Sequence, residues 1–498
     1  MTGANRLLIG IGWSMIVFIA YWQWRRQGER REGVTMERSK SVELTYLSVA
    51  CAYCLTLPLR RSVTLLDAAV LVSIPGSVLG LAELLHLGAP ELAPPLQALL
   101  YGMAVIGAAF VLAWAAEAAQ LDVSASLAIG VLALIAVLPE YAVGFVFAWK
   151  GGNDVERFGA GCVQPGSEGA SNCSLVLANM TGANRLLIGV GWSLIVFIAY
   201  WQWRRRRERH EGVRMERAKS VELAYLSVAC AYCLTLPLRR TVTLLDAVIL
   251  VTIFVFYTLR ISQAPQTEPE LLGPSAWVGG LGRRARRASV LAMFVFAGAV
   301  ILLVAEHFAD SLVDTGAELG VSEFLLVQWL APLASEAPEL LVVALYAWRL
   351  KTGEALTAVV SSKINQWTLL VGTLPLVFAI ASGSLHGLPV EPAQRQEILL
   401  TAAQTVFAVA ILVNLCISLR EALALFGLFW AQFILGGVVP SSIKGVELLT
   451  LSAVYILIGL WLLLRHRGDF ADRLRDGLRV PYTELEEAEA PAERQATK

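Results

Sequence analysis

Long apolar runs alternate with short polar loops over most of the 498-residue chain. An apolar run of about 20 residues has the length that an α-helix needs to cross a bilayer. From residue 96 onward, the runs that predict membrane spans cover residues 98–118, 124–149, 173–202, 220–237, 241–260, 288–306, 322–348, 355–382, 396–417, 421–438 and 446–464. An earlier apolar segment, 63–84, is interrupted by Pro75-Gly76, and the pattern leaves open whether it spans. The pattern predicts an all-α polytopic membrane protein whose surroundings are the lipid bilayer.

The composition supports this class. Hydrophobic residues make up 56% of the chain and charged residues 16%, whereas a soluble protein carries about 25% charged residues. The 40 Lys and Arg residues balance the 40 Asp and Glu residues, so no overall basic character predicts nucleic-acid binding.

From residue 96 onward, basic residues gather in three stretches, which lie near 203–219, at 283–287 and at 465–479. A further basic stretch, 24–40, does not fit the alternation of the later loops, so at least one of the first three apolar segments is expected not to span. Loops rich in Lys and Arg stay in the cytoplasm. We therefore expect a multi-pass protein of the plasma (inner) membrane, with residues 150–172 outside and the C-terminus in the cytoplasm. The charged tail, 466–498, is expected to be disordered.

Residues 1–74 are repeated as 180–253, with mostly conservative differences such as Ile11 for Val190. The first copy is not preceded by a counterpart of the carboxylate-bearing helix around Glu140. We interpret the segment 1–75 as a truncated, non-transporting duplicate. The alternative is a packing or regulatory element.

Charged residues inside the predicted spans are the main functional signal. Glu336 and Glu339 flank Pro338 in one apolar run, and Lys363 lies in the next run. A charge at mid-bilayer depth is costly unless it faces a polar interior, so such residues are candidates for a functional site. The two glutamates are three residues apart and share one helix face.

An earlier segment has a similar arrangement. Glu140 follows Pro139 in an apolar run, and the next run carries Thr181, Asn184 and Arg185. Proline kinks a helix and frees a backbone carbonyl, which can add an oxygen ligand for a hard cation. Interrupted helices in corresponding places of two repeats predict an ion site where the repeats meet.

This pattern resembles the sodium/calcium exchanger membrane family, within the cation/calcium antiporter superfamily. The stretches ADSLVDTGAELGVSEFLLVQWLAPLASEAPELLV and SSKINQWTLLVG carry the resemblance most clearly. It implies two inverted five-helix repeats with broken helices, 96–260 and 288–438. A cytoplasmic linker, 261–287, joins them, and an extra transmembrane helix, 439–465, follows.

The resemblance also implies a ligand set. Glu140 and Glu339 match the two central cation-binding glutamates of the family, and they are the expected metal ligands. The other positions that match its cation-binding motifs are Ser335, Ser362, Thr181, Asn184, Lys363 and Gln366. Glu336, beside these positions, is a further candidate ligand.

Several departures from the family pattern change the expected charge. Ala136 and Val137 replace hydroxyl-bearing residues, Thr181 and Lys363 replace amides, and Arg185 adds a second base. Counting Lys363 and Arg185 as charge-compensating against the three glutamates leaves about one negative charge. A calcium site favours several anionic oxygens. The balance therefore favours one sodium ion or one proton over calcium.

We therefore expect a secondary active antiporter that exchanges Na⁺ and/or H⁺, with Ca²⁺ as a further candidate, without a resident cofactor. The alternative is a transport-inactive structural or regulatory membrane protein that keeps the fold. An intramembrane enzyme would need a nucleophile and its base, or a metal-ligand set, which the glutamates and Lys363 alone do not provide.

The cysteines give a weaker signal. Cys162 and Cys173 lie in a polar, glycine-rich loop, and a disulfide would form between them if the loop faces outward. The sequence leaves this pairing open. Cys230 and Cys233 are interpreted as small residues of an apolar helix, because no soluble βαβ pattern surrounds them.

Overall fold

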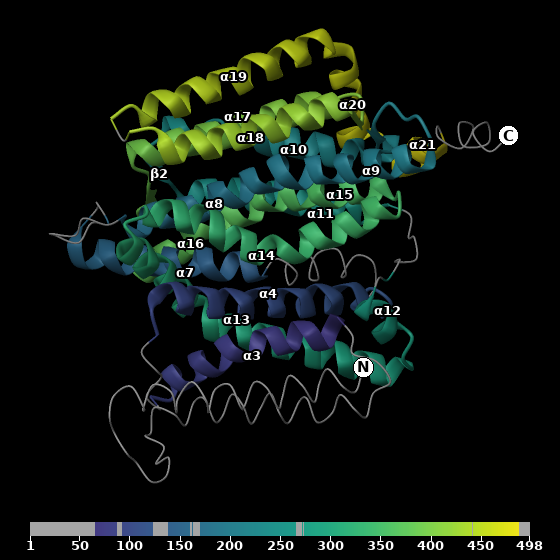
Figure 1. Cartoon of the computed structure of the whole chain (residues 1–498). Helices are drawn as coiled ribbons and strands as arrows, with labels where there is room; N and C mark the ends of the chain where they lie inside the picture. Colours follow the sequence, from purple (N-terminus) through teal and green to yellow (C-terminus); the bar gives the residue numbers. More distant parts are fainter. Residues whose placement is uncertain are drawn as a thin grey trace.

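The computed structural model describes residues 65–86, 92–122, 138–159, 162, 170–264, 271, 273–440 and 442–487. These residues form long helices that run side by side, with α19 (Lys444–Arg465) at one edge of the stack and α3 (Leu65–Leu84) toward the other (Figure 1). Of the predicted duplicate, only the last residues are described, as the first half of α3.

The helices between these edges form two successive sets. The first set consists of α4 (Pro94–Ala119), α7 (Leu138–Phe158), α8 (Asn172–Leu186) with its continuations η4 (Leu187–Trp192) and α9 (Ser193–Arg206), α10 (Ser220–Cys233) and α11 (Leu244–Ile261). The second set consists of α13 (Arg283–Leu319), α14 (Glu323–Trp348), α15 (Thr352–Asn365) with η7 (Gln366–Leu370) and α16 (Val371–Ser382), α17 (Pro392–Leu412) and α18 (Leu419–Val438). The short helix α12 (Pro274–Gly279) precedes α13.

Two short antiparallel ribbons tie the two sets together. Strand β1 (Val213–Arg214) pairs with β4 (Cys416–Ile417), and β2 (Thr241–Val242) pairs with β3 (Leu388–Pro389). Soon after β2 and β4 the chain enters a helix through a capping box, formed by Thr243 with Asp246 and by Ser418 with Glu421. A capping box satisfies backbone N–H groups that the first helical turn leaves unpaired. Each ribbon therefore fixes a loop of one set against a loop of the other.

The helix lengths agree with the predicted spans at most positions. Within the described residues, 11 helices are long and apolar enough to cross a membrane. One of them is 66–84, because α3 continues as one helix through Pro75, so the segment that the sequence left open is long and apolar enough to span. The helix α13 is longer than the predicted run 288–306, and residues 124–137 lie outside the described part.

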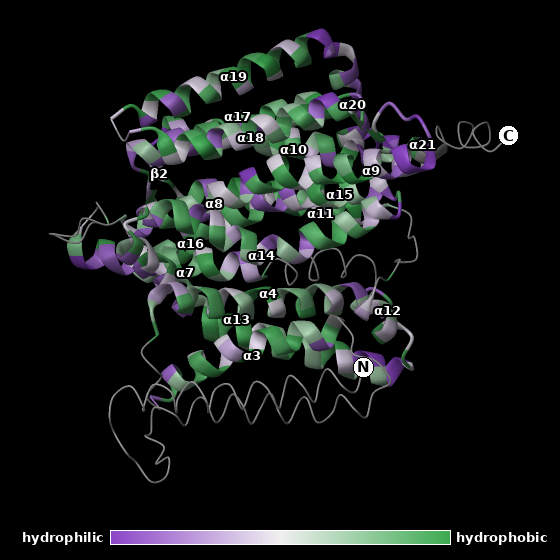
Figure 2. Ribbon diagram, in the orientation of Figure 1, coloured by the Kyte–Doolittle hydropathy of each residue, from purple (hydrophilic) through white to green (hydrophobic). Residues whose placement is uncertain are grey.

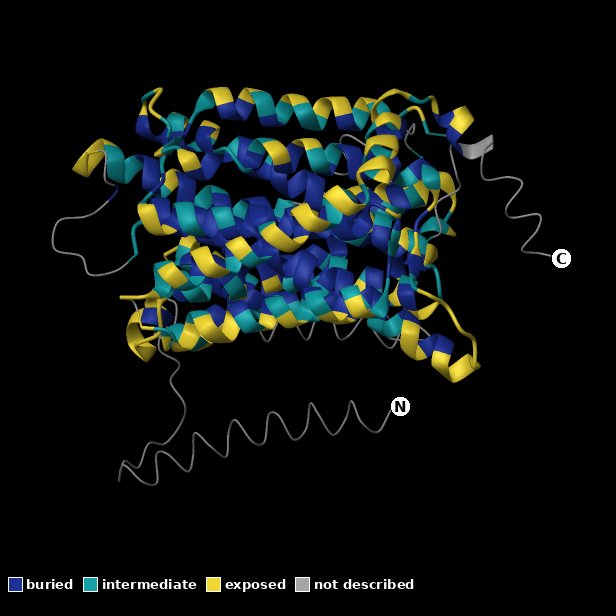
Figure 3. Ribbon diagram, turned by 90° about the horizontal axis from the view of Figure 1, so that it is seen from above, coloured by how far each residue is buried: buried dark blue, intermediate teal, exposed yellow. Residues whose placement is uncertain are grey.

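Hydrophobic residues cover most of the long helices, and polar residues concentrate near the helix ends and in α20 (Arg467–Arg479) and α21 (Tyr482–Glu487) (Figure 2). The buried residues fill the centre of the bundle, and the exposed ones lie on its periphery (Figure 3). The helix α17 is almost entirely buried, whereas α11, α18 and α19 have large exposed apolar side chains. In lipid such side chains face the acyl chains, so this distribution is that of a membrane protein.

Cys162 and Cys173 form a disulfide, so the pairing that the sequence left open is present. It ties the segment after α7 to the start of α8. Cys230 and Cys233 are buried and unbonded in α10, as small helix residues are expected to be.

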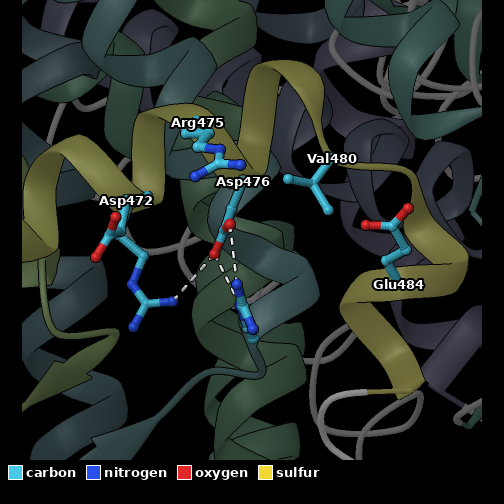
Figure 4. A pocket seen from close by; sticks show the side chains of 7 residues that line it. Asp472, Arg475, Asp476, Val480 and Glu484 are labelled. Atoms are coloured by element: carbon cyan, nitrogen blue, oxygen red, sulfur yellow. Dashed lines mark hydrogen bonds and ion pairs between the residues drawn. The ribbon is translucent and has the colours of Figure 1, made fainter.

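The tail is ordered through residue 487, contrary to the expectation of disorder, because it packs against the protein. Arg217 donates through Nε and Nη2 to the two carboxylate oxygens of buried Asp476, at 2.8 and 3.0 Å (Figure 4). Arg260 donates to the carbonyl oxygens of Gly477 and Val480. A small apolar cluster completes the contact, formed by Ala218, Val221, Tyr482 and Leu485.

We expect Asp476→Asn to loosen this tail without unfolding the membrane helices. The lost ion pair with a half-exposed arginine is worth about 1 kcal/mol, so the tail should open more often. Limited proteolysis measures this as faster cleavage between α19 and α21. Asp472→Asn, an exposed acid on the same helix, is the control. Equal cleavage of D476N and the unmodified protein would contradict the docking.

A second charged cluster closes the end of the bundle where α4 stops and α13 starts. Asp122 lies 2.6 Å from Arg286, 3.2 Å from Arg287 and 3.4 Å from Arg283. Arginines at a helix N-terminus oppose the helix dipole, and the carboxylate offsets them. The hydrogen bond from Arg286, supported by Arg287, lowers the pKa of Asp122 to about 2.

This pKa predicts a pH-dependent stability. A carboxyl group whose pKa falls from 3.8 to about 2 on folding stabilises the fold above pH 3.8, and it loses that contribution as the pH falls through about 2. Asp122→Asn should therefore lower the unfolding temperature near neutral pH and have little effect near pH 2. Thermal unfolding in detergent over this pH range measures the difference, with Glu156→Gln at an exposed acid as control. A deficit of D122N that is constant with pH would contradict the assignment.

Candidate cation site

Three glutamates singled out by the sequence lie on two helices that contact each other, α7 and α14. Glu140 is in the first turn of α7 and is 5% exposed. Glu336 is 2% exposed, and Glu339 is half-buried one turn further along α14. The helix α14 runs through Pro332 and Pro338 without interruption. The residues before Leu138, which include Ala136 and Val137, lie outside the described part.

The helix that follows α14 supplies the partners of its two glutamates. Ser362 donates through Oγ to Oε2 of Glu339 at 2.8 Å. Gln366 donates through Nε2 to Oε1 of Glu336 at 2.7 Å. The structure therefore brings together four of the predicted site residues. Ser335 instead donates to the carbonyl oxygens of Ala331 and Pro332 in its own helix.

Oxygen atoms remain available around these pairs. Oε1 of Glu140, Oε2 of Glu336 and Oε1 of Gln366 are buried and have no hydrogen-bond partner in the described part of the chain. A buried polar atom without a partner costs free energy, so the two carboxylate oxygens are positions for a proton or a cation, and the amide oxygen is a position for a cation. No group of three or more His, Cys, Asp or Glu side chains within the described residues could hold a metal ion. A cation here would therefore also need neutral oxygens.

Lys363 is fully buried and is held by α8. Its Nζ donates to the backbone oxygen and to Oδ1 of Asn184, both at 2.6 Å, and lies 5.2 Å from the ring centre of Trp367. Within the described residues no carboxylate lies within ion-pair distance of this ammonium. Glu140 and Glu336 act on it only through longer-range electrostatics. Lys363 thus compensates charge from the edge of the glutamate cluster.

Arg185 lies away from the glutamate cluster, so the charge balance expected from the sequence changes. Its Nη2 is 2.8 Å from Oε2 of Glu397, and its Nε donates to the backbone oxygen of Thr181 at 3.3 Å. Because Glu397 neutralises Arg185, the local balance is three carboxylates against Lys363. Thr181 itself donates to the Leu177 carbonyl oxygen and accepts a hydrogen bond from Gln328.

Sequence reasoning missed the polar face of α17. Gln394, Glu397, Thr401 and Gln404 follow one another at helical spacing, and all four are buried. The spacing of three, four and three residues places them on one face. This period was visible in the sequence, but Glu397 lies at the edge of the predicted span, where a charge is ordinary.

Short π-helical turns adjoin both polar segments. The turn η4 follows Thr181, Asn184 and Arg185 on α8, and η7 begins at Gln366, just after Lys363. Single π-helical turns occur often at functional sites. The two π-helical turns therefore lie on the two helices that carry the polar site residues, α8 with η4 and α15 with η7.

The paired helix sets, the membrane-spanning lengths and the buried glutamate cluster define a polytopic cation exchanger. The sequence profile of the sodium/calcium exchanger protein family matches residues 95–262 and 289–464. The chain belongs to this family, and the second matched segment includes α19, which the sequence analysis placed after the second repeat.

The chain is also similar to solved exchanger structures. The crystal structure of the H⁺/Ca²⁺ exchanger CAX is 39% identical, with a TM-score of 0.72, and the match covers 83% of this chain and 99% of that one. Native YfkE is 14% identical with a TM-score of 0.47, covering 80% and 99%. The sodium-calcium exchanger NCX_Mj is 16% identical with a TM-score of 0.41, covering 68% and 98%. No curated protein matches the chain.

We expect Asn184→Leu to destabilise the protein strongly, because it removes the side-chain acceptor of a fully buried ammonium. A hydrogen bond to a charged group contributes about 1.5–3 kcal/mol. Thermal unfolding of the purified protein measures the loss. The double variant with Lys363→Met should recover much of it, since the charge is removed as well. An N184L protein as stable as the unmodified one would contradict the role of Asn184.

Proposed function

We propose that the protein is a proton-coupled cation exchanger that works by alternating access at the glutamate cluster. The observation that carries this proposal is the pairing of Glu339 with Ser362 and of Glu336 with Gln366 between α14 and the next helix. Each carboxylate can take up a proton or contribute to a cation site, so the two ligands compete for the same oxygens. Competition for one site couples their movement.

The revised charge balance changes the preferred cation. With Arg185 neutralised by Glu397, three carboxylates face one lysine, which leaves about two negative charges. This balance supports a divalent cation, and Ca²⁺ prefers anionic oxygen ligands. The similarity to a solved H⁺/Ca²⁺ exchanger supports the same choice. We therefore propose Ca²⁺/H⁺ exchange as the leading activity.

Lys363 supports a second candidate, Na⁺/H⁺ exchange. It occupies a position where the family has an amide, so it replaces an oxygen ligand by a positive charge. Fewer ligands and a smaller negative charge suit a monovalent cation. The direct comparison of Ca²⁺ and Na⁺ in one assay separates the two activities.

We also propose the orientation of the chain. Three groups of arginines lie on the same side of the membrane if successive helices cross it in alternating directions. They are Arg204–Arg206 at the end of α9, the arginines at the start of α13 and those of α20. The positive-inside rule assigns that side to the cytoplasm. The C-terminus would then be cytoplasmic, in the plasma (inner) membrane.

Flux in sealed vesicles that contain the purified protein tests the proposed activity. A pH dye and a Ca²⁺ dye are read together after a Ca²⁺ gradient or an Na⁺ gradient is imposed. Proton movement should accompany Ca²⁺ movement and fall at least about tenfold in Glu339→Gln, as expected for a loss of about 1.4 kcal/mol in binding the cation.

Two outcomes would change the conclusion. Proton movement driven by Na⁺ and not by Ca²⁺ would assign the second candidate. Absence of any coupled flux in a folded protein would support the transport-inactive alternative. Glu318→Gln, at an exposed acid near the end of α13, is the control and should transport normally.

A further inference from the structure

A second polar cluster lies outside the glutamate site, where α14, α17, α18 and α19 converge on α8. Its side chains line a small cavity of about 10 Å³, which is close to the minimum for one water molecule. Two basic, two acidic and two amide side chains line it, namely Arg185, Lys444, Glu397, Glu447, Gln328 and Gln432. The orientation proposed above places this cavity in the outer half of the membrane.

The deep side of the cluster contains an ion pair, although the geometry at Nη2 of Arg185 is not that of a hydrogen bond. Arg185 is 1% exposed, pairs with Glu397 and packs 5.1 Å from the ring centre of Trp329. Gln328 donates through Nε2 to Oε2 of Glu397 at 3.2 Å. A desolvated ion pair with this support is expected to keep both charges, because removing either partner would leave a buried charge alone.

The outer side of the cluster is not satisfied. Both carboxylate oxygens of Glu447 and both amide atoms of Gln432 are buried and lack a hydrogen-bond partner within the described residues. Gln432 is 3% exposed. An ionised carboxylate without a partner is costly in such surroundings, whereas a protonated carboxyl group can donate to an amide oxygen.

The charges around Glu447 favour a proton over a metal cation. Lys444, Glu397 and Arg185 are the charged groups that act on it. With Glu447 ionised, the four charges cancel, so a divalent cation would leave two net positive charges next to two bases, whereas one proton leaves only one. The cavity also has no room for a hydrated ion. Proton uptake neutralises Glu447, and half-buried Lys444, in the first turn of α19, can keep its ammonium near the membrane surface.

One turn of α8 connects this cluster to the glutamate site. Thr181 accepts from Arg185 at its backbone oxygen and from Gln328 at Oγ1, while Asn184 holds Lys363. A Cβ added at Gly182 would overlap the backbone carbonyl of Gln328, so α8 and α14 touch directly here. A change of charge around Glu397 therefore alters the contacts of Arg185 and Gln328 with Thr181, in the same turn as Asn184, which binds Lys363.

We propose that Glu447, together with the Arg185–Glu397 pair and Gln432, forms a second proton-binding site through which external pH acts on the cation site. This proposal rests on the proposed proton-coupled exchange. It assigns the proton an additional position, separate from the glutamates that bind the cation.

Infrared difference spectroscopy of the purified full-length protein tests proton binding directly, without transport. The band of protonated carboxyl groups that appears on acidification from neutral pH to about pH 6, above the range in which exposed carboxyl groups take up protons, should lose one component in Glu447→Gln. Glu339→Gln should lose a different component, and Glu318→Gln none. An unchanged band in E447Q overturns the proposal. If E447Q does not fold, Gln432→Leu replaces it and should shift the same component, and an unshifted band overturns the proposal.

Flux measurements then test the link between the sites. In E447Q the slope of Ca²⁺ flux against external pH should correspond to one proton fewer than in the unmodified protein. Cation binding, measured by thermal stabilisation, should stay unchanged. Unchanged steepness overturns the link. If the unmodified protein moves no protons with cations, the proposed exchange fails, whereas the infrared result still decides whether Glu447 binds a proton.

Discussion

The turn of α8 from Thr181 to Arg185 makes polar contacts on two sides of the helix, and each contact involves a buried, positively charged side chain, Lys363 or Arg185. Asn184 accepts from Lys363, and the neighbouring Arg185 reaches in another direction to Glu397. A buried charge is tolerated only with a partner, so each contact fixes a neighbouring helix relative to α8. Because α15, α17 and α14 all meet this turn, the packing of the bundle centre depends on it.

Small residues make this arrangement possible. Gly182 lets the backbone of α14 approach so closely that no side chain fits between the helices. Gly189, in the π-helical turn, likewise accommodates the ring of Phe429 from α18. Small residues are the usual means by which membrane helices approach each other. Here Gly182 brings Gln328 of α14 to Thr181 of α8, so helix packing and this polar contact have the same origin.

The sequence predicted the parts of the site that stand out chemically. Glu140, Glu336 and Glu339 were recognisable because a charge in an apolar run is expensive, and the spans followed from run length. The direction of Arg185 was not predictable, because its partner Glu397 comes from a helix more than 200 residues later. Without that pairing, Arg185 was counted with the glutamate cluster. Likewise, the order of the tail depends on Arg217 and Arg260, which composition alone does not reveal.

The two polar clusters differ in how their charges are balanced, and this difference suggests different roles. Around Arg185 each positive charge has a negative counterpart, so the cluster is neutral without any ligand. Around Glu339 three carboxylates exceed one lysine, so this cluster is complete only when protons or a cation are bound. An exchanger needs this second condition, since a site that is stable when empty would have no reason to exchange one ligand for another. In the neutral cluster, by contrast, the Arg185–Glu397 pair holds α8 in place, and the proposed proton on Glu447 changes the charge of the cluster without a metal cation.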